Sequence, residues 1–242
     1  MTAAVELAEV VIELEGEGRS SRLSLAVESG EFLVLLGPNR SGKSLILELC
    51  AGLVAPQAGA VRVFGYDWAD LTDAEAMELR LHIGTVLQQP GLLSNMTLFN
   101  NVALPLRYHR ADLSEQEIRR TVMAHLDSLG IARVSERFLA QLNPGEIRCA
   151  AIARAMILDQ ELLLLDDPVA GLDADMVLRL VQHLAGYRNR RSLTIVATLR
   201  APSPFMDLAD RVALVRGGRI DAIGPRAALA QLAGTGMEAY RN

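Results

Sequence analysis

The chain has 242 residues, of which half are hydrophobic, 22% are charged and 4% are aromatic. This composition excludes a mainly disordered chain, and the length suits one large domain or a domain with a subdomain. The net charge of −5 argues against nucleic acid as a partner, because phosphate contacts need a basic surface. The mean hydropathy is +0.22, but no apolar run approaches the roughly 18 residues that span a bilayer. The acidic first fifteen residues lack the basic region of a signal peptide, so we expect a cytosolic chain. The high mean hydropathy leads us to expect that a partner covers part of its apolar surface.

Short strands dominate the first third of the chain. Alternating apolar and polar residues, or short apolar runs, predict them at 7–14, 22–28, 31–36, 60–64 and 83–87. The run at 31–36 is apolar throughout, which is typical of a strand buried on both faces. The glycine-rich sequence GPNRSGKS follows it at once, and a helical pattern over 45–54 comes next.

The rest of the chain alternates helical patterns with apolar strands. Helices are predicted near 97–107, 114–129, 145–157 and 175–187, and strands at 162–165, 192–198 and 212–215. This order indicates an α/β fold that a helical insertion interrupts. We expect one domain, with a nucleotide-binding core over 1–89 and 159–242 and a helical subdomain over 90–158. Cys50 and Cys149 lie in apolar helical patterns and are predicted to be buried free thiols.

Residues 37–44 fit the phosphate-loop pattern GxxxxGK[ST] without mismatch, between a buried strand and a helix. In such a loop, backbone N–H groups and the positive end of the helix surround the phosphates. Lys43 would reach the β and γ phosphates, and the Ser44 hydroxyl would hold Mg²⁺. The candidate nucleotide-binding residues are Gly37, Pro38, Asn39, Arg40, Ser41, Gly42, Lys43 and Ser44.

A second motif supports nucleotide binding. The apolar strand at 162–165 ends in Asp166, which would lie at the carboxyl edge of the sheet, where open α/β sheets bind ligands. Its carboxylate would bind Mg²⁺ directly or through water. The two motifs together predict a site for ATP and Mg²⁺.

A third motif, LNPGE at 142–146, precedes the helical sequence IRCAAIARAMIL. With the two motifs that flank it, this order resembles the nucleotide-binding ATPase subunit of ABC transporters, over essentially the whole chain. Gln88 matches the glutamine loop of that family, and residues 170–173 match its D-loop. The resemblance implies a P-loop NTPase core with a mixed sheet, antiparallel N-terminal strands and a helical insertion.

The resemblance also implies how the site is completed. A second ABC ATPase subunit, identical or different, pairs head to tail, and each ATP lies between the phosphate loop of one chain and the signature motif of the other. Asn143, Gly145 and Asp173 would then contact nucleotide across the interface. Gln88 would join Ser44 and Asp166 at the metal, and Gln88 and Asp167 would be the catalytic residues.

An integral membrane permease would dock near the glutamine loop and the insertion, which places the chain at the cytoplasmic face of the membrane. The residues expected on that surface are Leu92, Leu93, Met96, Phe99 and Tyr108. In the alternative interpretation, these residues instead fill a small core within the insertion. The sequence at 98–107 resembles the MCE/Mla type that moves lipids, with an MCE-type lipid-binding protein as a further partner. ATPases of lipoprotein-export and cell-division systems carry similar segments.

Four departures from the family pattern concern catalysis. Asp167 stands where the family has glutamate, and Leu199 where it has the switch histidine. The signature LNPGE has lost its serine, its first glycine and its glutamine, and Leu14 replaces an aromatic residue that stacks on adenine. These changes predict that ATP binding is kept and hydrolysis is slow. A regulatory or structural pseudo-ATPase is the alternative, and a soluble ABC protein without a membrane partner is disfavoured.

Overall fold

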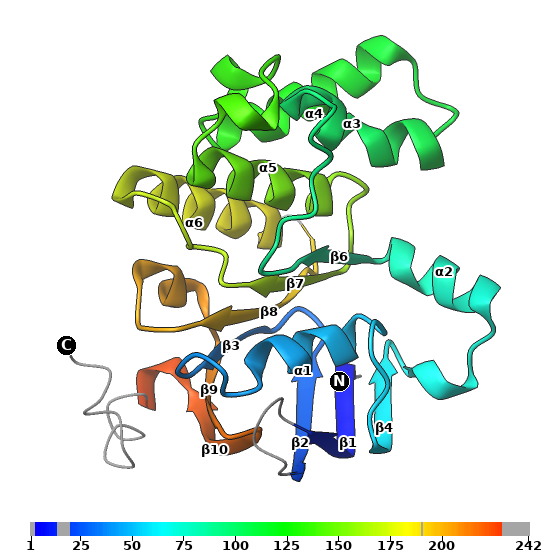
Figure 1. Ribbon diagram of the computed structural model, residues 1–242, viewed down its shortest axis with the longest axis vertical. Coiled ribbons are helices and arrows are strands. Elements are labelled where there is room, and N and C mark those ends of the chain that lie inside the picture. Colours follow the sequence, from blue (N-terminus) through cyan, green and yellow to red (C-terminus); the bar gives the residue numbers. More distant parts are fainter. Residues whose placement is uncertain (1–2, 14–19, 190, 229–242) are drawn as a thin grey trace.

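The computed structural model of the protein describes residues 3–13, 20–189 and 191–228. The expected position of Leu14 lies outside these residues. Two sheets form the framework (Figure 1). The larger has the strand order β10 (Arg219–Pro225), β9 (Arg211–Arg216), β3 (Phe32–Leu36), β8 (Thr194–Leu199), β7 (Leu162–Asp166) and β6 (Ile83–Val86). The smaller has the order β2 (Ser20–Glu28), β1 (Ala3–Glu13), β4 (Ala58–Val63) and β5 (Tyr66–Asp67).

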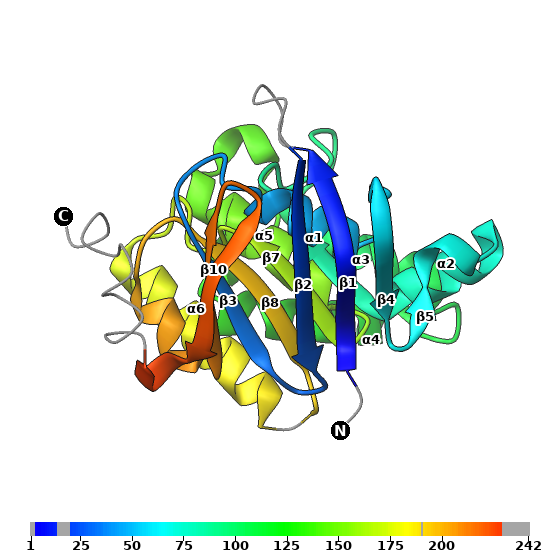
Figure 2. The same cartoon turned by 90° about the horizontal axis from the view of Figure 1, so that it is seen from below.

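The direction of the strands agrees with the predicted mixed sheet. All pairs of the larger sheet are parallel except β9 with β10, which are antiparallel. The smaller sheet is antiparallel throughout, which confirms the antiparallel N-terminal strands. Figure 2 views the molecule from the side of this smaller sheet.

The central strands are buried on both faces, as the apolar run at 31–36 predicts. In β3, Phe32, Val34 and Leu36 pack into one core, and Leu33 and Leu35 pack into the other. Side chains alternate between the faces of a strand, so both layers beside the sheet must be apolar. Helix α1 (Lys43–Cys50) fills the layer between the two sheets, where it contacts β4, β7 and β8 (Figures 1 and 2).

The other face of the larger sheet carries α5 (Pro144–Met156) and α6 (Ala174–Arg188), with α3 (Leu98–His109) and α4 (Glu115–Ser128) stacked above them (Figure 1). Helix α5 contacts α3 and α4 on one side and β6 and β7 on the other. None of the helices in the described residues is long and apolar enough to cross a membrane. Short 3₁₀ turns lie at Trp68–Asp70, Ala132–Val134, Leu139–Gln141, Pro204–Leu208 and Arg226–Ala228.

Within the described residues, two strands and one α-helix were not predicted: β5, β10 and α2 (Asp73–Leu81). Helix α2 is largely exposed and lacks a strong apolar stripe, so periodicity does not reveal it. It starts with a capping box in which the Thr72 side chain accepts the N–H of Glu75 and the Glu75 carboxylate accepts the N–H of Thr72. That pattern was the available sequence signal.

The five apolar residues expected at a docking surface do not share one environment. Phe99 is buried in the core, and Leu92 packs against it. Leu93 and Tyr108 are 41% and 77% exposed, and Met96 is partly buried. The small-core interpretation therefore holds for the first two, and only Leu93 and Tyr108 offer open apolar surface.

Both cysteines are free and buried, as predicted. Burial raises the pKa of the Cys50 thiol and of the Cys149 thiol to about 12. Because the thiolate is the reactive species, we expect iodoacetamide at pH 8 to modify neither cysteine in the folded chain and both in denaturant. Mass spectrometry of the two samples checks this, and rapid modification of the folded chain would contradict it.

Gly84 in β6 lets α5 approach the sheet. A Cβ atom at this position would lie 2.1 Å from the Ala155 carbonyl oxygen and 2.5 Å from Leu163 Cδ2. We expect Gly84→Ala to lower the free energy of unfolding by about 3 kcal/mol, as overpacking does, measured by urea denaturation. The matched control is Gly186→Ala in α6, where a Cβ atom meets no heavy atom of the described part of the chain within 4 Å. That change should stabilise the helix by roughly 0.5–1 kcal/mol, and equal effects of the two substitutions would contradict the packing argument.

Candidate functional site

The phosphate-loop sequence forms the turn between β3 and α1. The Gly37 N–H donates to the Leu199 carbonyl oxygen at 3.2 Å, and a Cβ at Gly37 would lie 2.2 Å from the Val215 carbonyl oxygen. Only glycine fits this close approach to β9. Gly42 and Arg40 adopt φ values of 97° and 61°; for arginine, the left-handed conformation costs roughly 1–2 kcal/mol.

Lys43 begins α1 and folds back over the loop. Its Nζ donates to the carbonyl oxygens of Gly37 and Pro38 at 2.7 and 2.6 Å and to Ser41 Oγ at 3.1 Å. Burial lowers the pKa of Lys43, and the negative charges of Asp166 and Asp167 oppose that shift. Among the described residues, no side chain caps the start of α1, so its first-turn N–H groups can meet an anion.

Two adjacent carboxylates face this loop from the end of β7. Asp166 pairs with Thr198 across the parallel strands β7 and β8. Thr198 Oγ1 donates to Asp166 Oδ1 at 2.5 Å and accepts the N–H of Asp167 at 3.0 Å. One hydroxyl therefore fixes both residues, a role that sequence reasoning did not assign to Thr198.

Asp167 is held in a constrained position. Its φ is 48°, and its Oδ2 lies 2.7 Å from Arg200 Nε in an ion pair. Burial is the main cause that raises the pKa of Asp167, while the charge of Arg200 acts in the opposite direction. Strained backbone of this kind persists where the surrounding structure fixes it, often at functional sites.

Leu199 does not face the loop. It is fully buried in the core that also holds Ile195 and Ala197 of β8, so it lies on the opposite face of β8 from Thr198. Arg200, the next residue, returns to the side of the phosphate loop. Sequence reasoning compared only Leu199 with the family and missed Arg200; the alternation of the strand was the available signal.

These groups line one open hollow of about 920 Å³. It brings together the predicted residues Lys43, Ser44, Gln88, Asp166 and Asp167, which come from three separate parts of the chain. The hydroxyl, amide and carboxylate oxygens of Ser44, Gln88 and Asp166 suit Mg²⁺, which takes few protein ligands beside phosphate oxygens. The described residues that line the hollow include no aromatic side chain; they are Glu13, Asn39, Arg40, Ser41, Gly42, Lys43, Ser44, Leu45, Glu48, Val54, Gln88, Asp166, Asp167, Thr198 and Arg200.

Helix α5 positions the segment that contains Gln88. The buried guanidinium of Arg148 donates to the carbonyl oxygens of Leu87 and Gln88, each at 2.9 Å. Arg154 donates to those of Pro90 and Gly91 at 3.0 and 2.9 Å. Two arginines in an otherwise apolar helix were the sequence signal for this contact, which was not predicted.

The signature segment begins α5 and does not line the hollow. Asn143 is the N-cap, its Oδ1 accepting the N–H of Glu146 at 2.9 Å, and Pro144 occupies the first turn. The Glu146 carboxylate accepts the N–H of Asn143 at 3.0 Å and lies 3.1 Å from Arg133. Glu146 therefore completes a helix cap and has a cationic partner, where sequence reasoning counted only its charge.

The predicted D-loop packs against this segment. A Cβ at Gly145 would lie 2.7 Å from the Gly171 carbonyl oxygen, so the two glycines allow a close backbone contact. Asp173 caps α6, its Oδ1 accepting the N–H of Met176 at 2.8 Å. The segment with Asn143 and Gly145 thus lies close to the segment with Asp173, although the two are far apart in the sequence. These three residues are not among those that line the hollow.

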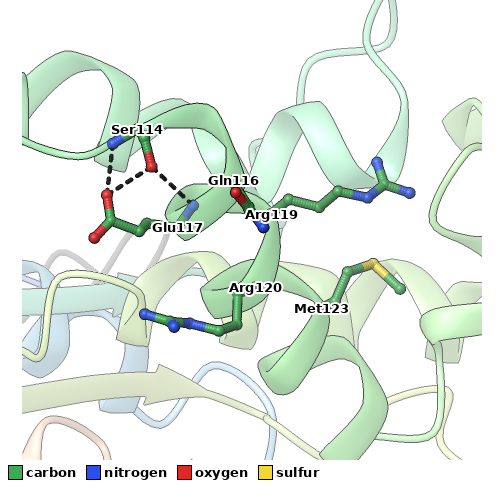
Figure 3. A pocket seen from close by; sticks show the side chains of 6 residues that line it. All are labelled: Ser114, Gln116, Glu117, Arg119, Arg120 and Met123. Atoms are coloured by element: carbon green, nitrogen blue, oxygen red, sulfur yellow. Dashed lines mark hydrogen bonds between the residues drawn. The ribbon is translucent and has the colours of Figure 1, made fainter.

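A second depression lies on α4 (Figure 3), lined by Ser114, Gln116, Glu117, Arg119, Arg120 and Met123. Ser114 and Glu117 are engaged in the capping box of the helix. The depression has none of the loop backbone or paired carboxylates of the hollow at α1. The hollow at α1 is therefore the candidate nucleotide site.

Comparisons with known proteins agree with this geometry. The family model described as ABC transporter matches residues 20–170. The chain is 31% identical over 222 residues to the molybdate/tungstate import ATP-binding protein WtpC of Thermococcus kodakarensis, covering 89% of this chain and 65% of that protein. It is 34% identical over 222 residues to the sulfate/thiosulfate import ATP-binding protein CysA of Mesorhizobium japonicum, covering 91% and 63%. It is 31% identical over 227 residues to the probable ribonucleotide transport ATP-binding protein mkl of Mycobacterium leprae, covering 91% and 65%.

A solved structure adds the fold. The dimeric ATP-binding cassette MJ0796, in a post-hydrolysis state bound to ADP and phosphate, superposes with a TM-score of 0.84 at 26% identity, covering 91% of this chain and 98% of that one. This confirms the predicted P-loop NTPase fold of the ABC type. The chain spans between 52% and 65% of the lengths of the curated relatives it matches. By the family match and by the identity to these relatives, the chain belongs to the ABC transporter family.

Proposed function

We propose that the chain is the ATP-binding subunit of a membrane transporter and that it binds Mg-ATP but hydrolyses it slowly. One observation carries the proposal: residues 39–44 of the phosphate loop, the two carboxylates at the end of β7 and Gln88 line a single hollow. Family membership implies ATP as the ligand and Mg²⁺ as its usual metal.

In this proposal the loop backbone and the first turn of α1 surround the phosphates. Lys43 exchanges its bonds to the loop carbonyls for the β and γ phosphates. Ser44, Asp166 and Gln88 would hold Mg²⁺, which would neutralise phosphate charge when bound. Asp167 accepts a hydrogen bond from the attacking water and orients it toward the terminal phosphate.

Three features support slow hydrolysis. The side chain of Asp167 is one methylene shorter than glutamate, and a misplacement of about 1 Å can cost roughly 100-fold in rate. Its carboxylate lies 2.7 Å from Arg200, in an ion pair that has to open before the carboxylate can accept a hydrogen bond from water. Leu199 is buried in the core and cannot donate a hydrogen bond to the phosphate.

A second ATPase subunit would complete the site, with Asn143 and Gly145 of its signature and Asp173 of its D-loop facing the nucleotide. Both subunits would work with a permease at the cytoplasmic face of the membrane. The exposed Leu93 and Tyr108 and the segment held by Arg148 and Arg154 are the proposed contact with that permease. Most of this contact would lie in the proposed helical subdomain over 90–158, and Leu87 and Gln88 would join it from the end of the core segment.

For the transported molecule we propose a lipid, moved with an MCE/Mla-type permease and an MCE-type lipid-binding protein. The sequence NVALPL within α3 supports this substrate class. The names of the relatives above state import of oxyanions or transport of ribonucleotides for those proteins, which makes a small solute the competing substrate class.

The experiment uses the complex purified through a tag on this chain and reconstituted in vesicles. ATP-dependent transfer of a fluorescent phospholipid, lost in Lys43→Ala, is the expected result. Transfer of sulfate or molybdate with no transfer of phospholipid would overturn the lipid proposal and keep the transporter. Full transport by the Lys43→Ala complex would overturn the ATP-driven function and favour the structural pseudo-ATPase.

A further inference from the structure

Arg200 is a charged residue of the hollow to which the proposed function gives no part in binding nucleotide. It follows β8 directly and lines the hollow together with Lys43 and Ser44. Its side chain is 49% exposed, whereas that of its partner Asp167 is 12% exposed. Apart from this ion pair, its guanidinium makes no hydrogen bond to any residue in the described part of the chain. Donor groups of Arg200 therefore remain available to a ligand.

The other cations near the site are more fully engaged. Arg148 uses its guanidinium on the carbonyl oxygens of Leu87, Gln88 and Asp166. Lys43 Nζ makes three hydrogen bonds to the phosphate loop. The positive charge of Arg200 is close enough to Lys43 to lower the pKa of that lysine, so both cations act on the same part of the hollow.

The chemistry of arginine suits a terminal phosphate. The guanidinium has five N–H donors in a planar fork that can bind two oxygens of one phosphate group. With Nε directed at Asp167, four N–H donors on the two Nη atoms are left. A terminal phosphate carries more negative charge than the single carboxylate of Asp167, so it competes well for the guanidinium.

We propose that Arg200 binds the terminal phosphate of ATP and that this contact weakens its ion pair with Asp167. The proposal rests on the proposed function, because it requires nucleotide in the hollow. Before ATP binds, Arg200 holds the carboxylate of Asp167. After ATP binds, the carboxylate is free to accept a hydrogen bond from water. ADP lacks the terminal phosphate and leaves the ion pair intact.

Asp167 and the terminal phosphate compete for Arg200. Removing Arg200 or the Asp167 carboxylate should therefore change the affinity for ATP more than the affinity for ADP. Without Arg200, ATP loses a charge-assisted bidentate contact and ADP loses little. Without the Asp167 carboxylate, Arg200 no longer has to leave a partner, so ATP should bind more tightly. A counterion that serves only Asp167 would also change the charge near the terminal phosphate, but Arg200→Lys would then bind the ATP analogue as the parent does, because lysine keeps the charge and loses only the planar fork.

The test measures affinities of the full chain for a non-hydrolysable ATP analogue and for ADP, both with Mg²⁺, by displacement of a fluorescent nucleotide. We expect Arg200→Ala to weaken binding of the ATP analogue about tenfold and of ADP less than about twofold. Arg200→Lys, which keeps the charge and loses the fork, should weaken the analogue by about threefold. Asp167→Asn should strengthen it by about threefold. The matched control is Arg110→Ala, whose Nη2 lies at the same 2.7 Å from Asp112 on an exposed turn, and which should change neither affinity.

The outcomes separate the two proposals. A parent chain that binds neither nucleotide overturns the proposed function itself. A parent that binds both, with equal losses or no loss in Arg200→Ala, overturns the role of Arg200 and leaves the proposed function standing. If Arg200→Ala does not fold, as circular dichroism would show, Arg200→Lys and Asp167→Asn decide: an unchanged ratio of ATP-analogue to ADP affinity in both contradicts the proposal.

Discussion

Replacing Lys43 with alanine is expected to weaken ATP binding by about 100-fold, because two charge-assisted contacts of roughly 1.5 kcal/mol each are lost. Isothermal titration of Mg-ATP into the full chain measures the effect. Arg110→Ala, which removes one positive charge on an exposed turn far from the phosphate loop in sequence, should leave the affinity unchanged. A Lys43→Ala chain that binds ATP within a few-fold of the parent would contradict the assignment of the phosphate loop.

Lys43 also offers a direct chemical readout, since it is the only lysine in the sequence. Its amino group lies within the phosphate loop, where it donates to the carbonyl oxygens of Gly37 and Pro38. An ATP analogue that acylates amines should therefore label one internal site, and excess ATP should protect it. Labelling confined to the N-terminal amine would show that the phosphates do not reach Lys43.

Replacing Asp167 with asparagine is expected to lower single-turnover hydrolysis by about 100-fold or more, the usual contribution of a positioned acid or base. Bound ATP should remain, since Asp167 is not proposed to bind the phosphates. The comparison of bound with hydrolysed ATP in one rapid-quench experiment measures both. An unchanged rate would remove Asp167 from the mechanism.

The pH dependence of that rate has a definite sign. Burial raises the pKa of Asp167 above 3.8, its ordinary value, so the carboxylate takes up its proton at a higher pH than an exposed aspartate does. The parent rate should fall as the pH drops through this raised pKa, and the remaining rate of Asp167→Asn should not follow that fall. Parallel profiles in the two proteins would assign the acid limb to another group.

Lengthening the side chain provides the opposite change. Asp167→Glu should raise the single-turnover rate by about tenfold if the missing methylene limits positioning. Leu199→His cannot be used to restore a switch histidine, because Leu199 is fully buried and an imidazole there would lose its hydrogen bonds to water. The residue at the end of β8 that lines the hollow is Arg200, the next one along the chain.

The parts of the site that the sequence predicts are those where a motif coincides with a burial pattern. The apolar run at 31–36 predicts a strand buried on both faces, and the sequence GPNRSGKS after it predicts a phosphate loop before a helix. The structure contains this strand, and helix α1 begins at Lys43. The strand that ends in Asp166 succeeds for the same reason. Both predictions depend on neighbouring residues along the chain, which is what a sequence displays.

The parts that were missed depend on contacts between distant segments. Arg154 reads in the sequence only as an interruption of an apolar helix, and its bonds to Pro90 and Gly91 require the folded arrangement. Arg200 was missed because Leu199 was compared with a family position without asking which face of β8 it occupies. The positive φ value of Arg40 has no signal in residue type, and that of Asp167 has only a weak one, because aspartate adopts the left-handed region more often than most residues.

The central claim, ATP binding with slow hydrolysis, is tested most directly by a single-turnover experiment. Excess complex, purified through a tag on this chain, is mixed with radiolabelled Mg-ATP, and bound ATP, ADP and phosphate are separated over time. We predict that the label is bound at once as ATP and is hydrolysed more slowly than about 1 s⁻¹, the lower end of ordinary enzyme turnover. Failure to bind ATP, or hydrolysis at about 10 s⁻¹ or faster, would contradict the account.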